Sequence, residues 1–128
     1  MNKKILSTKK APAAIGTYSQ GVVLDNLIFT SGQIGIDPST GTIKQGGIEA
    51  ETKQVLENIE SVLIEGGVDR SNIVKLTVYL KDFADFPVIN NQFKEFFIDC
   101  TYPARSTVEV SKLPMDAMVE IDCIAYGS

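Results

Sequence analysis

The chain has 128 residues, 44% of them hydrophobic and 22% charged, which fits one ordinary globular domain spanning residues 1–128. Its net charge is −4, and four of its twelve basic residues lie in the first ten positions, which opposes nucleic acid as a partner of the folded body. No apolar run reaches the roughly 20 residues of a membrane span and no secretory signal opens the chain, so we expect a cytoplasmic protein without membrane association.

The first half predicts a hairpin followed by a helix. Two β-rich runs, residues 19–25 and 27–31, meet at Asp25-Asn26, residues that tolerate the positive φ of a tight turn. Apolar residues between Val55 and Leu63 then recur at helical spacing, and the glycine pairs at 46–47 and 66–67 delimit the helix.

The second half predicts a strand, a helix and two further strands. Residues 73–80 alternate, with Val74, Leu76, Val78 and Leu80 on the more apolar face. A helix over residues 86–97 follows a possible cap at Asp82, and strands are expected over 104–110 and 117–126. The order β-β-α-β-α-β-β predicts an α+β fold in which two helices pack on one face of a mixed sheet. The other face is apolar enough that we expect an identical subunit to cover it.

Arg105 stands inside a predicted strand, although only two of the twelve basic residues are arginines. Alternation places Arg105 on one face of its strand and Glu120 on one face of the last strand, so we expect them on the same side of neighbouring strands. One interpretation is an ordinary ion pair on a solvated face. The other is a clamp for a ligand carboxylate, because a planar guanidinium binds carboxylates in bidentate fashion. The second arginine, Arg70, lies in a turn-like segment, where we expect it to be solvated.

Two glycine-containing segments are candidates for a cleft. The turn at Ser31-Gly32 can expose backbone N–H groups to a ligand, although it can equally be a plain turn. Tyr18 is flanked by Gly16 and Gly21 and is expected either at a cleft wall or at a subunit contact. The chain has no histidine, and Cys100 and Cys123 lack metal-site or disulfide-framework spacing, so we expect no metal and interpret both cysteines as small buried hydrophobes.

Five segments together resemble the Rid/YjgF family of reactive-intermediate deaminases. They are GTYSQG, FTSGQIGIDPSTG, ETKQVLENIESVL, INNQFKEFF and YPARSTVEVSKLPMDAMVEIDCIA, in this order over nearly the whole chain. The resemblance implies a chorismate-mutase-like fold and a homotrimer with ligand clefts between subunits. It also implies a 2-iminobutanoate/2-iminopropanoate deaminase, which hydrolyses 2-imino acids to 2-oxo acids and ammonia without a cofactor.

The resemblance assigns roles to matching residues. The catalytic positions it implies are the carboxylate-binding Arg105, the water-handling Glu120 and the cleft residue Tyr18. The substrate contacts it implies are Ser31, Gly32, Asn90 and Thr107. Many relatives have cysteine where Thr107 stands and tyrosine where Phe93 stands, which leaves the preferred substrate open.

Two other functions remain open on the sequence. A sensor that binds a small 2-oxo acid without catalysis would need the same Arg105, and only Glu120 would distinguish it from an enzyme. RNA binding, as a translation inhibitor or endoribonuclease, is also attributed to members of this family. The acidic composition and the missing histidine oppose RNA chemistry.

Overall fold

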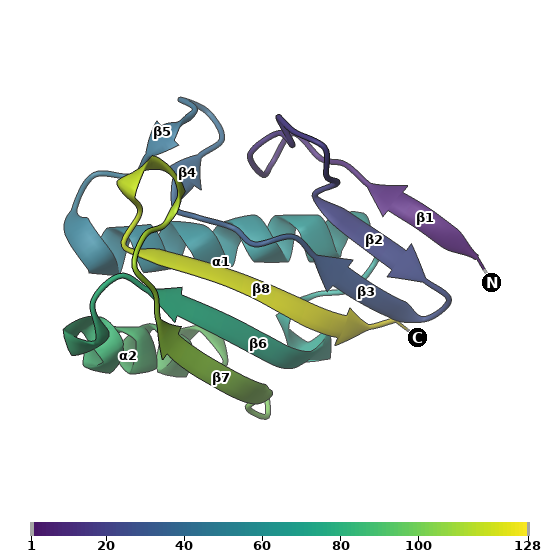
Figure 1. Ribbon diagram of the computed structural model, residues 1–128. Coiled ribbons are helices and arrows are strands. Elements are labelled where there is room, and N and C mark those ends of the chain that lie inside the picture. The colour runs from purple at the N-terminus through teal and green to yellow at the C-terminus, as the bar shows by residue number, and fades with distance from the viewer. Residues whose placement is uncertain (1, 128) are drawn as a thin grey trace.

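A computed structural model describes residues 2–127 and contains one six-stranded sheet with two helices on one side (Figure 1). The strand order is β1-β2-β3-β8-β6-β7, and a separate two-stranded hairpin is formed by β4 and β5. All neighbours in the large sheet are antiparallel except β6 and β7, which α2 connects in parallel, so the predicted mixed sheet is confirmed. The elements are β1 (Lys3–Leu6), β2 (Gly21–Leu24), β3 (Leu27–Thr30), β4 (Ile36–Asp37), β5 (Thr42–Ile43), α1 (Gly47–Glu65), β6 (Ile73–Leu80), α2 (Phe86–Phe96), β7 (Ala104–Glu109) and β8 (Val119–Tyr126).

The core lies between the helices and the sheet. Helix α1 contributes an apolar stripe at the predicted spacing, and α2 contributes buried aromatic residues. Strand β8 runs through the middle of the sheet and buries every second residue. The side chains that are almost completely buried include Val55, Ile59, Leu63, Leu76, Ile89, Phe97 and Ile121.

Strand β6 departs from the predicted alternation at its first residues. Leu76, Val78 and Leu80 are buried as expected, but Val74 is exposed and Ile73 is buried. The pairing of β6 with β8 is irregular between Ile73 and Lys75, and an irregularity of this kind changes which face a residue points to.

Arg70 is only partly solvated, whereas a solvated residue was expected, and it joins three segments of the fold. Its guanidinium forms an ion pair with Glu60 of α1, in which Nε lies 2.8 Å from the carboxylate. Nη1 donates to the carbonyl of Phe96 at the end of α2, and the cation lies 4.2 Å from the centre of the Phe96 ring. Hydrogen bonding to Glu60 raises the pKa of Arg70. The guanidinium of Arg70 therefore has its counterion within the subunit.

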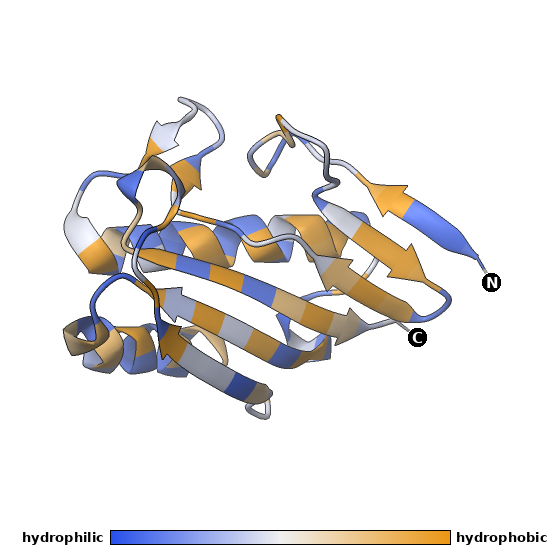
Figure 2. Ribbon diagram, in the orientation of Figure 1, coloured by the Kyte–Doolittle hydropathy of each residue, from blue (hydrophilic) through white to orange (hydrophobic). Residues whose placement is uncertain are grey.

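The face of the sheet opposite the helices carries large exposed apolar residues. Figure 2 shows hydrophobic residues along β2 and β3 and at alternate positions of β8. The exposed members on the outer side of β3, β7 and β8 are Leu27, Phe29, Val108 and Tyr126. A patch of this kind is typical of a surface that a partner covers.

No helix within residues 2–127 is long and apolar enough to cross a membrane.

Candidate active site

Arg105 lies on the edge strand β7 and points to the helix side of the sheet. Its register partner on β6 is the buried Leu76, and directly opposed residues of neighbouring strands share a face. Nη1 of Arg105 donates to Oδ1 of Asn90 on α2 at 2.8 Å. The guanidinium also lies 5.1 Å from the ring centre of Phe86 and 5.5 Å from that of Phe93. These contacts orient the cation but leave its charge without a carboxylate partner among residues 2–127.

Thr107 lies two residues further along β7 and offers a backbone donor. Successive N–H groups of a strand point to opposite edges, and the N–H of Val110 donates to the carbonyl of Leu80 on β6. The N–H groups of Arg105 and Thr107 therefore point to the open edge of the sheet, beside the guanidinium. The hydroxyl of Thr107 is buried and has no hydrogen-bond partner within the described chain. Arg105, Asn90 and Thr107, with Phe86 and Phe93, form what we call the arginine half-site.

Glu120 lies on β8 and points to the opposite face. Its neighbours Val119 and Ile121 are buried against the helices, so the half-buried Glu120 faces outward beside its register partner Tyr79. Burial raises the pKa of Glu120, and the nearby Asp122 raises it further. A raised carboxyl pKa suits a group that must accept and return a proton near neutrality.

Glu120 borders a cleft of about 190 Å³. Its lining includes Ile15, Tyr18, Gly32, Ile34, Met115 and Glu120. Gly32 leaves room for the carboxyl group, because a Cβ at residue 32 would lie 2.8 Å from the carboxyl carbon of Glu120 and would displace this side chain. The ring of Tyr18 is 51% exposed and forms one wall. We call Glu120, Tyr18 and Gly32, with the apolar residues of this cleft, the glutamate half-site.

The loops around the glutamate half-site are fixed by buried amides. The side chain of Gln20 accepts from the N–H of Thr8 and donates to the carbonyl of Pro12, each at 2.7 Å, which holds the segment before Tyr18. Ser31 has a similar structural role, because its hydroxyl donates to the carbonyl of Ser19 and its N–H to that of Gln20. Ser31 therefore lies next to the cleft, but its hydroxyl is already used.

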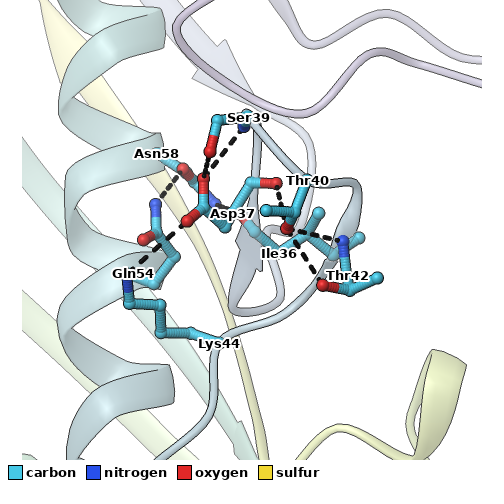
Figure 3. Close-up of polar contacts among 8 residues, drawn as sticks. All are labelled: Ile36, Asp37, Ser39, Thr40, Thr42, Lys44, Gln54 and Asn58. Carbon is cyan, nitrogen blue, oxygen red and sulfur yellow. Dashed lines mark hydrogen bonds and ion pairs between the residues drawn. The ribbon is translucent and has the colours of Figure 1, made fainter.

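A second buried amide, that of Asn58, holds the segment that includes Ile36 of the cleft lining, and Figure 3 shows its contacts with Gln54 and Ile36. Asn58 of α1 donates to the carbonyl of Ile36 at 2.9 Å and to that of Ile34 at 3.3 Å, while it accepts a bond from Gln54. Hydrogen bonds from Ser39 lower the pKa of Asp37 and close the turn between β4 and β5. Helix α1 thus positions the strand that lines the cleft.

The expectation that Arg105 and Glu120 lie on the same side of neighbouring strands is wrong within one subunit. Strand β6 lies between β7 and β8, and the two side chains point to opposite faces of the sheet. Alternation gave the spacing along each strand, but it could reveal neither the strand order nor which face meets the helices. The predicted residues therefore form two groups instead of one.

The site also contains residues that the sequence analysis did not select. Asp122 shares the outer face with Glu120 and accepts a 3.3 Å hydrogen bond from the hydroxyl of Tyr79. Burial raises the pKa of Asp122, although the bond from Tyr79 opposes this, and burial followed by Asp122 raises the pKa of Tyr79. The alternation of β8 could have indicated Asp122, since it lies two residues from Glu120.

The similarity of this chain to known proteins defines its family. The family model described as Endoribonuclease L-PSP matches residues 8–127, and the chain belongs to this family, the YjgF/Rid family. It is 47% identical over 123 residues to the 2-iminobutanoate/2-iminopropanoate deaminase of Bos taurus, covering 96% of this chain and 89% of that protein. It is 48% identical over 126 residues to a RutC family protein of Pyrococcus abyssi, covering 98% of each.

A solved structure shares the fold closely. The crystal structure of Escherichia coli TdcF with bound serine has a TM-score of 0.94 and 42% sequence identity, and the match covers 98% of this chain and 99% of that one. The predicted resemblance to the family is therefore confirmed, together with the α+β fold. The relatives agree on the family but carry different names, so the comparison does not establish the reaction of this chain.

Proposed function

We propose that the protein hydrolyses 2-imino acids such as 2-iminobutanoate to 2-oxo acids and ammonium, at sites formed between subunits of a homotrimer. The observation that carries this proposal is the oriented Arg105, which has no carboxylate partner within residues 2–127 and stands beside backbone donors at an open sheet edge. Relatives named as imine deaminases support the reaction class. A cytoplasmic location and the absence of a nucleic acid partner remain part of this proposal.

Binding of the substrate carboxylate is the first role. Arg105 and the N–H of Thr107 would donate to it, while Asn90 keeps the guanidinium in place. Charge-assisted hydrogen bonds of this kind each stabilise a bound, water-shielded carboxylate by about 1.5–3 kcal/mol. A neighbouring subunit would supply the shielding, because Arg105 is exposed in the single chain.

Proton handling by Glu120 is the second role. The ionised carboxylate holds a water molecule, accepts its proton as the oxygen attacks the iminium carbon, and so forms a neutral carbinolamine. Glu120 then returns this proton to the nitrogen, the C–N bond breaks, and the hydroxyl proton leaves with ammonia as ammonium. Such positioned acid–base help typically accelerates a reaction by about 10²–10⁴-fold. Tyr18 would close the cleft beside the reacting carbon.

The test is the rate of 2-oxobutanoate formation from 2-iminobutanoate, generated in situ by an amino-acid oxidase with catalase, while semicarbazide competes for the imine. We expect wild type to accelerate the reaction, Arg105→Ala to abolish the acceleration, and Glu120→Gln to lower kcat more than it raises KM. Unchanged rates in these folded variants would remove both residues from the mechanism.

The sensor and RNA functions predict other results. For a sensor, wild type would give no acceleration, yet calorimetry would show that it binds 2-oxobutanoate with an affinity that Glu120→Gln hardly changes. For an RNA-binding protein, single-stranded RNA would bind with an affinity that falls steeply as salt increases. The family description as an endoribonuclease makes this RNA measurement necessary.

A further inference from the structure

A groove of about 440 Å³ runs between α2 and the start of β7, next to Arg105. Its volume is within the range of small-molecule sites. Leu76, Phe93 and Phe97 form an apolar floor, and Asn90, Lys94 and Arg105 are among its polar lining. The groove therefore shares Asn90, Phe93 and Arg105 with the arginine half-site.

The charge of the groove is entirely positive. Lys94 and Arg105 both line it, and no carboxylate does. Neither cation forms an ion pair within residues 2–127, whereas Lys44, Arg70 and Lys81 each do. Charge complementarity thus favours a ligand with two negative groups, one for each cation.

The helix rise between Asn90, which holds Arg105, and Lys94 indicates the length of that ligand. Lys94 follows Asn90 by four residues on α2, so the two lie on the same side of the helix with a rise of about 6 Å between them. Asn90 is bonded to Arg105. A dicarboxylate of five carbons in all separates its two carboxyl carbons by about 5 Å when extended, which is close to one turn of the helix.

We propose that this groove is a subsite for a second, distal carboxylate, so that five-carbon 2-imino dicarboxylates belong to the substrates of this protein. The first carboxylate binds Arg105, the two methylene groups lie on the apolar floor, and the distal carboxylate binds the ammonium of Lys94. As a statement about substrates it rests on the proposed imine hydrolysis, but as a binding site it can be measured separately.

The experiment compares kcat/KM for 2-iminoglutarate and 2-iminobutanoate, each generated in situ from its amino acid by an oxidase, in wild type, Lys94→Met and Lys94→Arg. Lys94 is exposed, so its substitution leaves the core intact. The quantity compared is kcat/KM for 2-iminoglutarate divided by kcat/KM for 2-iminobutanoate. We expect Lys94→Met to lower this ratio by about tenfold, because the substitution removes one charge-assisted bond. Lys94→Arg should keep most of the wild-type ratio. Lys53→Met, which removes an exposed lysine of α1, is the matched control and should leave the ratio unchanged.

Calorimetry with 2-oxoglutarate and 2-oxobutanoate separates the subsite from the reaction. If wild type hydrolyses neither imine but prefers 2-oxoglutarate, and Lys94→Met loses this preference, the subsite stands and the proposed catalysis fails. If wild type hydrolyses 2-iminobutanoate while Lys94→Met leaves both the substrate ratio and the 2-oxoglutarate affinity unchanged, the subsite is refuted and the catalysis stands. Equal affinities for both oxo acids in wild type would also refute it.

Discussion

The two arginines of the chain show how partners decide the role of one residue type. Arg70 has the carboxylate of Glu60 and the carbonyl of Phe96, so its charge and its donors are used inside the subunit. Arg105 has a neutral amide, Asn90, and aromatic rings, which orient the guanidinium without neutralising it. A cation held in place without a counterion is ready for an anionic ligand, because little ordering remains to be done on binding.

Asp122 tunes the proton affinity of Glu120, and this can be tested by pH. The groups that face Glu120 are Asp122 on β8, Tyr79 on β6 and Tyr18 across the cleft. Burial and then the charge of Asp122 raise the pKa of Glu120 above its ordinary value of 4.5. The proposed hydrolysis needs ionised Glu120, so we expect the rate to fall as pH drops through this raised pKa. Asp122→Asn removes a negative neighbour, and we therefore expect the acid limb of the kcat/KM profile to shift to lower pH.

The measurement is a kcat/KM profile for 2-iminobutanoate from about pH 4 to about pH 8, which spans the ordinary pKa of a glutamate and neutrality. Asp99→Asn is the control, since Asp99 is an exposed carboxylate after α2 and should leave the profile in place. A shift of the acid limb to higher pH, or the same shift in both variants, would contradict the role given to Asp122.

At the level of elements, the hydrophobic periodicity of the sequence predicted both helices and the first hairpin, and the structure contains them. Both helices and the strands of the two-residue hairpin at Asp25-Asn26 lie within a few residues of their predicted bounds, because each has a regular apolar face. Strand β1 was missed, since its four residues begin with Lys3 and Lys4 and it lies at the sheet edge, where burial leaves little signal. The strand order arises from long-range pairing, which no local pattern contains.

The Arg70 contact joins α1, the turn before β6 and the end of α2, and its loss should destabilise the fold. Arg70→Met removes the side-chain bonds to Glu60 and Phe96 and leaves the half-buried Glu60 carboxylate without a cation, with only the backbone N–H of residue 70 as a donor. We expect a loss of about 1–3 kcal/mol in the free energy of unfolding, since the pair is partly exposed. Arg70→Lys should recover little of it, because an ammonium cannot reproduce the planar fork.

Urea denaturation at one protein concentration measures this loss as a lower midpoint with an unchanged slope. Lys53→Met is again a suitable control and should stay within about 0.5 kcal/mol of wild type. If Arg70→Met unfolds at the same urea concentration as wild type, the contact contributes no stability.

For the whole molecule, the two half-sites and the apolar sheet face both favour an oligomer in which subunits meet at this face. Arg105 and Glu120 lie on opposite faces of one sheet, so a substrate cannot contact both within one subunit unless the fold rearranges. Exposed residues such as Phe29 and Val108 lie on the same face as Glu120. A symmetric oligomer that covers this face can place the arginine half-site of one subunit beside the glutamate half-site of the next.

Mixing the two impaired variants tests this arrangement directly. Arg105→Ala retains its glutamate half-site and Glu120→Gln retains its arginine half-site, so a mixed trimer contains some interfaces with both intact groups. After co-expression at equal levels and a check of trimeric mass by light scattering, random assembly should restore about a quarter of the wild-type rate, because each interface needs one subunit of each kind in the right order. Each variant alone serves as the control and should keep only its own low rate. If the mixed trimer is as slow as the two separate variants, the intact groups do not meet between subunits. A monomeric mass for wild type at micromolar concentration would exclude the assembly itself.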